Sequence, residues 1–308
     1  MRKLRTLPAL LVLALVITGC KGPSVPMPGS ASHVDLEREV VLSGTVSDGE
    51  NRWDYRITTY TVSGEHCADD GSGRVLTRHS YQTPSMEVMR SDGQTHVSPD
   101  ATRAAETFNA HFQRVLEEEV AWFDEMAADA EADYGAVGHQ DTGMWSLDAF
   151  CYSDEATLDF WSNGRLVCIT TARWSYSGGL HPITWRTGET FDLRTGGIVT
   201  VTDLTDNVAQ LQSAVEQELL RQAEEKQHAE DDPSGNQDKS PVYYDDYPET
   251  LHEWMDRPVI FGDEGMTVIF GVYDLASYAD GEQTFLIPYE CLAPYLNDFG
   301  HSVLELPE

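Results

Sequence analysis

Basic residues are scarce in this sequence of 308 residues, which has 20 Lys and Arg against 52 Asp and Glu and a formal net charge of −32. Such a chain is repelled by the phosphate backbone of nucleic acids and by anionic lipid headgroups within the Debye length. The charge therefore excludes nucleic-acid binding as a leading function. It favours cationic partners, unless the acidic surface serves only to keep the chain dispersed in water.

Long apolar runs are absent after the first twenty residues. Residues 1–19 combine a basic start at Arg2, Lys3 and Arg5 with an apolar stretch too short for an ordinary spanning helix, as in a secretory signal. They end in Ile-Thr-Gly before Cys20, which resembles a bacterial lipobox, where the cysteine is diacylated and becomes the first mature residue. We therefore predict a lipoprotein signal peptide and a lipid-anchored position on the extracytoplasmic face of a bacterial cell envelope. The alternative is a conventional signal peptide followed by a buried or disulfide-bonded cysteine.

The rest of the chain is expected to form three parts. Residues 20–33 are rich in Pro, Gly and Ser and bury little apolar area, so we expect a semi-extended tether. Residues 34–140 are expected to form an N-terminal α+β subdomain, and residues 141–308 a C-terminal α+β domain. No later segment is long and apolar enough to cross a bilayer, so we expect no cytoplasmic domain.

Cysteine is also rare, with five residues in the whole chain. The four beyond Cys20 are an even number in an exported protein and allow three complete disulfide pairings. Their wide spacing lacks the close Cys or His pairs typical of zinc sites. We expect disulfides or buried free thiols, and no metal, at Cys67, Cys151, Cys168 and Cys291.

Alternating apolar and polar residues, separated by turn-forming residues, predict strands in both parts. In the N-terminal part these strands surround residues 40–42, 53–57, 75–76 and 86–88. In the C-terminal part they cover residues 149–152, 157–161, 166–174, 184–193, 198–201, 259–261, 267–273 and 284–287. The step from Asn163 to Gly164 predicts a tight hairpin in which both residues have positive φ.

Helical spacing of apolar residues predicts two long helices. The first begins at Pro99, and the second runs from near Asp206 to about Gln227, with apolar residues on one face. A short C-terminal helix is expected over residues 288–296. Strand runs with two long helices, and without regular alternation of strand and helix, predict an α+β fold around antiparallel sheets.

Four motifs occur in a fixed order along the chain: Tyr-Ser-Gly-Gly-Leu-His-Pro at residues 176–182, Phe-Asp-Leu-Arg-Thr-Gly-Gly at 191–197, Val-Tyr-Asp-Leu-Ala-Ser-Tyr-Ala-Asp-Gly at 272–281, and Ile-Pro-Tyr-Glu-Cys-Leu at 287–292. Together they resemble the RsiV-like extracytoplasmic domain family, shared by the anti-sigma factor RsiV and the N-terminal part of the deacetylase PdaC. The chain departs from the family at Leu180, where a small residue is usual. It also carries a predicted lipid anchor in place of a spanning helix and a sigma-binding segment.

The resemblance implies a class of binding partner and a set of motif residues. RsiV binds lysozyme, so the resemblance implies a cationic, lysozyme-like protein as partner, with a cell-wall-derived ligand as a further option. The family-motif residues, which are either structural or binding, are Tyr176, Gly178, Gly179, His181, Pro288 and Tyr289.

A second candidate for ligand binding lies in a long loop expected over residues 228–253. This loop contains an aromatic and acidic run of the kind that steers and anchors a basic protein, although a merely solvated loop has the same composition. The run consists of Tyr243, Tyr244, Asp245, Asp246 and Tyr247.

Signals for catalysis are weak. Ser177 lies outside the Gly-x-Ser-x-Gly context of a nucleophile, and no acidic partner for His181 follows from spacing, so we assign no catalytic residue. The histidines are scattered and do not form the metal site of a deacetylase. We expect a noncatalytic binding domain without a cofactor. The alternatives are an envelope glycan-modifying enzyme, or its accessory subunit, and an architectural lipoprotein.

Overall fold

The computed structural model describes residues 37–48, 51–90, 97–137, 151–228 and 241–306. Cys20, the tether and the expected domain boundary at residues 140–141 lie outside these ranges. The described residues fall into two compact units. The first unit comprises those within residues 1–44, 53–157 and 174–182, and the second comprises those within residues 45–52, 158–173 and 183–308.

Within the described ranges, nine strands form two sheets in the order of the sequence. The six-stranded sheet contains β1 (Glu37–Asp48), β2 (Asn51–Cys67), β3 (Val75–Arg90), β4 (Tyr152–Ser162), β5 (Leu166–Tyr176) and β6 (Ile183–Asp192). The three-stranded sheet contains β7 (Val259–Phe261), β8 (Gly265–Phe270) and β9 (Gln283–Pro288), paired antiparallel.

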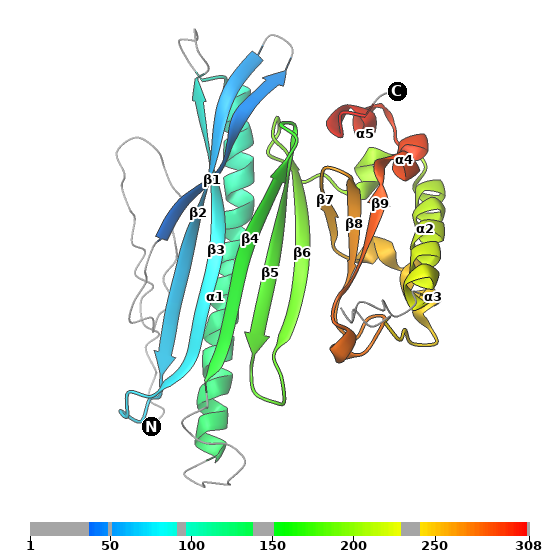
Figure 1. Ribbon diagram of the computed structural model, residues 1–308. Helices are drawn as coiled ribbons and strands as arrows, with labels where there is room; N and C mark the ends of the chain where they lie inside the picture. The colour runs from blue at the N-terminus through cyan, green and yellow to red at the C-terminus, as the bar shows by residue number, and fades with distance from the viewer. Residues whose placement is uncertain (1–36, 49–50, 91–96, 138–150, 229–240, 307–308) are drawn as a thin grey trace, which may run out of the picture. The chain divides into compact units, whose positions relative to one another are not determined.

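In the first unit, the long helix α1 (Pro99–Val137) lies along β3 (Figure 1). Its predicted apolar face is buried: Phe108 and Phe123 are fully enclosed, and Phe123 packs with Leu76 of β3. The side chain of Asn109 fixes the helix to the strand, because its amide donates to the Met86 carbonyl and accepts from the Met86 N–H.

One strand pair differs from the expected antiparallel arrangement. β2 and β3 are antiparallel, but β3 and β4 are parallel, with Thr77 opposite Tyr152 and Tyr81 opposite Ala156. Parallel neighbours need a long crossover between them, and α1 lies in the connection from β3 to β4. The segment from β3 through α1 to β4 therefore forms a β-α-β step within the six-stranded sheet.

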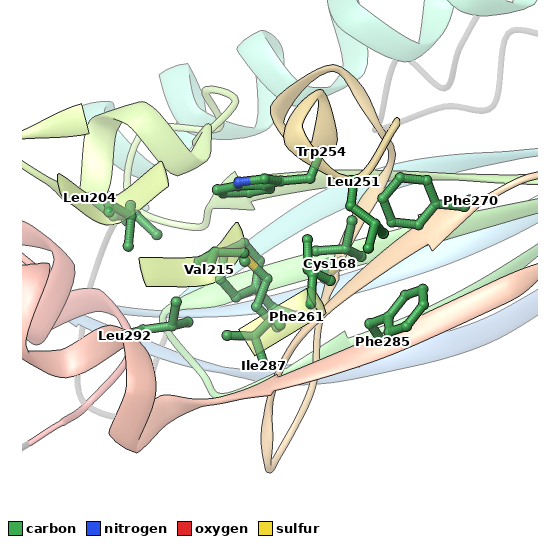
Figure 2. Packing of buried hydrophobic residues seen from close by; sticks show 14 of the residues in the cluster. Cys168, Leu204, Val215, Leu251, Trp254, Phe261, Phe270, Phe285, Ile287 and Leu292 are labelled. Atoms are coloured by element: carbon green, nitrogen blue, oxygen red, sulfur yellow. The ribbon is translucent and has the colours of Figure 1, made fainter. Parts of the chain in front are cut away.

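In the second unit, helix α2 (Val208–His228) covers the three-stranded sheet near β9 (Figure 1). Figure 2 shows the core between them, where Cys168 lies among apolar side chains that include Trp254 and Phe270. The α2 side chains also cover the open edge of β9, because Gln222 donates to the Leu286 carbonyl over 2.7 Å. An exposed strand edge would otherwise present unpaired carbonyls.

The remaining helices are short. They are α3 (Tyr247–His252), α4 (Tyr289–Leu292) and α5 (Asp298–Val303), together with 3₁₀ turns η2 (Val201–Leu204), η3 (Trp254–Asp256), η4 (Tyr278–Asp280) and η5 (Ala293–Tyr295). The helix expected over residues 288–296 is thus one turn of α4 followed by η5. Pro294 explains the break, since it has no N–H to donate to the carbonyl four residues earlier.

The α+β class, with two long helices and short C-terminal helices, is confirmed. The hairpin between β4 and β5 is also present, but its turn differs from the prediction. Gly164 has a φ of 88°, whereas Asn163 is not among the described non-glycine residues with positive φ. Asn163 instead accepts hydrogen bonds from the Arg165 and Leu166 N–H groups through its side chain. Among the described residues, no helix is long and apolar enough to cross a membrane.

Candidate functional site

The predicted binding run at residues 243–247 is divided between core and surface, beginning with Tyr243. This residue is only 6% exposed, and its hydroxyl donates to Gln283 Oε1 over 3.3 Å. Burial raises the pKa of Tyr243 to about 12. Its backbone forms an isolated bridge with Ala276, which holds the ring inside the second unit. Tyr243 is therefore a core residue and offers no surface to a ligand.

The other members of the run reach the surface to different degrees. Tyr244 is 39% exposed, and Asp245 and Asp246 are exposed. Tyr247 is the first residue of α3 and packs partly against the core. Part of the segment that was expected to be a loop is therefore helical, and Tyr244 is its best exposed aromatic side chain.

The motif at residues 176–182 forms the tip between β5 and β6. Gly178 and Gly179 have φ values of 93° and 95°, which side-chain-bearing residues rarely adopt. The Tyr176 hydroxyl donates to the Gly179 carbonyl over 3.1 Å and closes the tip. His181 is exposed, with Nδ1 3.2 Å from the Pro182 carbonyl oxygen. These contacts explain the motif as a turn.

The motif at residues 287–292 also has structural contacts. Pro288 ends β9 and precedes α4. The Tyr289 hydroxyl donates to the Gly262 carbonyl over 2.8 Å, and burial raises the pKa of Tyr289. Tyr289 thus ties the beginning of α4 to the turn between β7 and β8.

The four described cysteines are all free thiols. Cys168 is buried, and burial raises its pKa. Cys291 is half-buried on α4, and Cys67 is exposed at the end of β2. Cys151 is half-buried, with its sulfur 3.9 Å from a guanidinium nitrogen of Arg78. Within the described ranges, no group of three His, Cys, Asp or Glu residues could hold a metal ion.

The loop between β8 and β9 presents an aromatic pair that the strand and helix patterns do not reveal. Tyr273 has a φ of 71° and is 51% exposed. A left-handed backbone at a bulky residue is strained, typically by about 1–3 kcal/mol. Its ring lies 5.8 Å from that of Tyr278, with the ring planes at 37°. We call Tyr273 and Tyr278 the tyrosine platform.

The loop is held rigidly beneath the platform. The Asp274 N–H donates to the Gly271 carbonyl and closes the turn, with Tyr273 at its third position. Asp274 Oδ2 accepts from the Gly271 N–H over 2.8 Å and from Arg257 over 3.1 Å. Glycine or asparagine normally occupies a turn position with positive φ. The surrounding contacts therefore impose the strained conformation that carries the Tyr273 ring.

A charged pair lies next to the platform in sequence. Arg186 of β6 binds Glu282 through Nε over 2.7 Å and through a second, shorter contact. Their side chains are 39% and 17% exposed. Tyrosine and arginine are enriched among the residues that dominate protein interfaces, which makes this part of the second unit a candidate contact surface.

A second feature lies on the first unit, along the C-terminal half of α1. Residues 117–133 contain eight acidic residues and no Lys or Arg. The helix also lacks a basic residue in its last turn, so nothing offsets the negative end of its dipole. We call its exposed residues the helix surface: Glu117, Glu118, Trp122, Asp124, Glu125, Asp129 and Asp133.

In the sequence, Tyr273 is marked only as part of the family motif at residues 272–281. The signal that identifies it is backbone strain at an exposed aromatic residue, and this signal requires coordinates. The helix surface, in contrast, could have been recognised from the run of acids within a predicted helix.

Comparison with known proteins links part of the chain to a family without an established function. Residues 199–290 match the family described as "Protein of unknown function (DUF3298)". No curated protein matches the chain. A crystal structure of a DUF3298 family member from Bacteroides fragilis is similar at 14% identity and a TM-score of 0.49, covering 88% of this chain and 96% of that one. A DUF3298 family protein from Pseudomonas aeruginosa is similar at 14% identity and a TM-score of 0.46, covering 81% and 96%.

Proposed function

We propose that this chain is a noncatalytic binding domain, held at the extracytoplasmic face of a bacterial envelope by lipid on Cys20, that captures a cationic protein. The observation that carries the proposal is the tyrosine platform. An exposed ring on a strained backbone is unfavourable for the isolated chain, and such strain is typical of functional sites. A recognition role gives this conformation a reason to persist.

Charge specifies the class of partner. The chain carries a net charge of −32, and the helix surface concentrates acids on exposed positions of α1. Complementary charge speeds the encounter of two proteins and suppresses wrong partners. A basic protein is therefore the partner that this surface attracts, and the resemblance to RsiV-like domains makes lysozyme the first one to test.

The binding experiment uses the full-length chain in mild detergent and hen egg-white lysozyme, with affinity measured by calorimetry over a range of salt concentrations. We expect a saturable complex that weakens as salt rises, because ions screen exposed charges. Tyr273→Asn tests the platform, since asparagine tolerates positive φ but removes the ring. Val242→Asn is the matched control, because Val242 is an exposed apolar residue of the same unit that lies outside the platform and outside the run at residues 243–247. A complex that Tyr273→Asn leaves unchanged would contradict the platform, and no complex at low salt would contradict lysozyme as partner.

The proposed anchor has a separate test. Mass spectrometry of the exported chain is expected to show an acylated N-terminal cysteine at position 20, and Cys20→Ser is expected to release the chain from the membrane fraction. Export without an acyl group would contradict the anchor and leave the binding proposal standing.

A further inference from the structure

The tip between β5 and β6 holds an aliphatic side chain almost entirely in water. Leu180 is 98% exposed, and it directly follows Gly178 and Gly179, whose positive φ values turn the chain at this point (Figure 1). Removing apolar surface from water is favourable in proportion to the area removed. Leu180 is therefore an apolar knob that a second surface can bury.

The segment around the knob lacks the charge that keeps copies of this chain apart. Acids make up 52 of the 308 residues, and the net charge of −32 makes two copies repel each other. Residues 160–188, however, contain no Asp or Glu. This acid-free run includes all of β5, the tip and the first half of β6. A second copy can approach the tip with less repulsion than it meets at the acid-rich segments.

The second unit contains an apolar recess of about 220 Å³. It lies between the end of β6, residues 198–202 and residues 255–261. Ile198 lines its rim and is 48% exposed, whereas Phe261 lines its interior and is 2% exposed. Cavities of about 150 Å³ with Leu, Ile and Phe walls hold a benzene molecule. The recess is therefore large enough for a leucine side chain.

The tip and the recess lie toward different ends of β6. The tip precedes Ile183, the first residue of the strand, whereas the recess begins at Gly188. A strand advances about 3.3 Å per residue, so these five steps cover roughly 16 Å. The described residues that line the recess include none from the tip. The tip of a second copy is therefore better placed to fill the recess than the chain's own tip.

We propose that Leu180 of one copy inserts into the apolar recess of a second copy and joins the copies head to tail. One exposed apolar side chain that fits a pocket elsewhere on the same molecule is sufficient for such a contact. Because the two surfaces differ, each pair keeps one free tip and one free recess, and further copies can add. A contact of this small size is weak, with a Kd expected on the order of 100 µM.

This contact does not rest on the lysozyme proposal. Leu180 and Ile198 belong to neither the tyrosine platform nor the helix surface. Salt should also act in opposite directions on the two kinds of binding. Screening reduces the repulsion between two acidic copies and strengthens their contact, whereas it weakens attraction to a basic protein. Failure of one proposal therefore leaves the other standing.

The test is sedimentation velocity on the full chain carrying Cys20→Ser, so that no acyl group gathers copies in detergent micelles. The concentration runs from about 10 µM to about 1 mM, which brackets the expected Kd. We expect the average sedimentation coefficient to rise with concentration beyond that of a dimer, and to rise more steeply at high salt. A chain that stays monomeric up to about 1 mM at high salt would overturn the proposal and leave the tip to another partner.

Two variants locate the two halves of the contact. Leu180→Ser and Ile198→Asn should each weaken association by about tenfold or more. Val242→Ser is the matched control and should associate like the parent, because Val242 is 77% exposed and does not line the recess. If Ile198→Asn lowers the thermal midpoint, Thr202→Trp replaces it and obstructs the recess from an exposed lining position. Association that survives in either folded variant would overturn the assignment.

Mixing the two variants tests the head-to-tail arrangement. The Leu180→Ser chain keeps an intact recess, and the Ile198→Asn chain keeps an intact tip. Neither should associate alone, but an equal mixture should form a one-to-one complex that stops at two copies. A symmetric contact, in which the same surface meets itself, predicts no such recovery. A mixture of folded variants that stays monomeric would therefore contradict insertion of the tip into the recess.

Discussion

The helix surface of the first unit and the tyrosine platform of the second unit differ in how their side chains are held. Residues 117–133 carry eight acids, and the members of the helix surface are exposed. The platform consists of two uncharged rings on a loop whose turn Asp274 fixes through two hydrogen bonds. The helix surface offers exposed charges, and the platform offers uncharged aromatic rings on a hydrogen-bonded turn.

The two regions are therefore expected to affect different steps of binding. Exposed charges act over several ångströms and mainly change the association rate. Rigid aromatic side chains act on contact and mainly change the dissociation rate. Variants of the two regions should therefore separate these two rates, and variants of the residues packed behind them test how each unit is held together.

The largest effect is expected from loosening α1 from its strand. Phe123 is fully buried and packs on His79 of β3, with ring centroids 4.9 Å apart. Phe123→Ala should lower the free energy of unfolding by about 3–5 kcal/mol, through lost apolar contact and the cavity that remains. The neighbouring Trp122 is 43% exposed, so Trp122→Ala should lower the free energy of unfolding clearly less than Phe123→Ala does. Denaturant unfolding measures both, and equal losses would contradict the helix orientation.

The next effect concerns the platform itself. Tyr273→Ala should weaken lysozyme binding by about 2 kcal/mol or more, roughly 30-fold in Kd, mainly through faster dissociation. Tyr273→Gly should weaken binding equally while leaving the thermal midpoint unchanged or higher, because glycine relieves the positive φ. Surface plasmon resonance measures the affinity and the dissociation rate, and calorimetric melting measures the thermal midpoint. A glycine variant that melts well below the parent would show that Tyr273 serves stability.

A smaller, pH-dependent effect is expected at the covered edge of β9. The Lys226 amine donates to the Thr284 carbonyl over 2.6 Å and lies 4.2 Å from the centre of the Phe285 ring. Burial lowers the pKa of Lys226 from its ordinary 10.5. Between the lowered pKa and 10.5, the unfolded chain binds more protons at this site, so the free energy of unfolding should rise with pH there.

Lys226→Met removes this titration and leaves the Thr284 carbonyl without its donor. Its unfolding free energy should be lower than that of the parent by about 1–3 kcal/mol, and the gap should widen as pH rises through that window. Urea unfolding at several alkaline pH values measures the gap. A gap that narrows with pH would contradict the direction of the pKa shift.

The smallest effect on stability is expected at the helix surface. Glu125 and Asp129 are four residues apart, and like charges at this spacing destabilise a helix by about 0.2–0.5 kcal/mol. The double variant Glu125→Gln, Asp129→Asn should gain about that much stability. It should also slow association with lysozyme at low salt and leave dissociation nearly unchanged. Glu249→Gln with Glu264→Gln, two exposed acids of the second unit, is the charge-matched control. Equal slowing by both pairs would assign the attraction to net charge alone.

The elements with strong local signals were predictable from sequence. The apolar spacing of α1 and α2 located both helices, because a long amphipathic pattern has few other solutions. The turn at Asn163 and Gly164 located a hairpin. The conformation of that turn was not predictable, since side-chain hydrogen bonds from Asn163 replace the positive φ that a two-residue hairpin would need.

The features that the sequence did not predict all depend on contacts between residues far apart in the chain. The parallel pairing of β3 with β4 follows from where α1 returns the chain, and strand composition did not indicate it. Tyr243 looked like a surface residue among acids, but its bridge to Ala276 draws it into the core. Tyr273 has its positive φ in a turn whose Asp274 is held by Arg257, seventeen positions before Asp274 in the chain. Chemistry can be proposed from residue types, but the exposure of each ring depends on packing.

Hydrogen exchange on the full-length chain, with and without hen egg-white lysozyme at low salt, tests the central claim most directly. If the tyrosine platform captures lysozyme, peptides that span residues 271–281 should exchange more slowly on binding, and Tyr273→Asn should disrupt the complex. Binding that protects other segments and leaves residues 271–281 unchanged would contradict it.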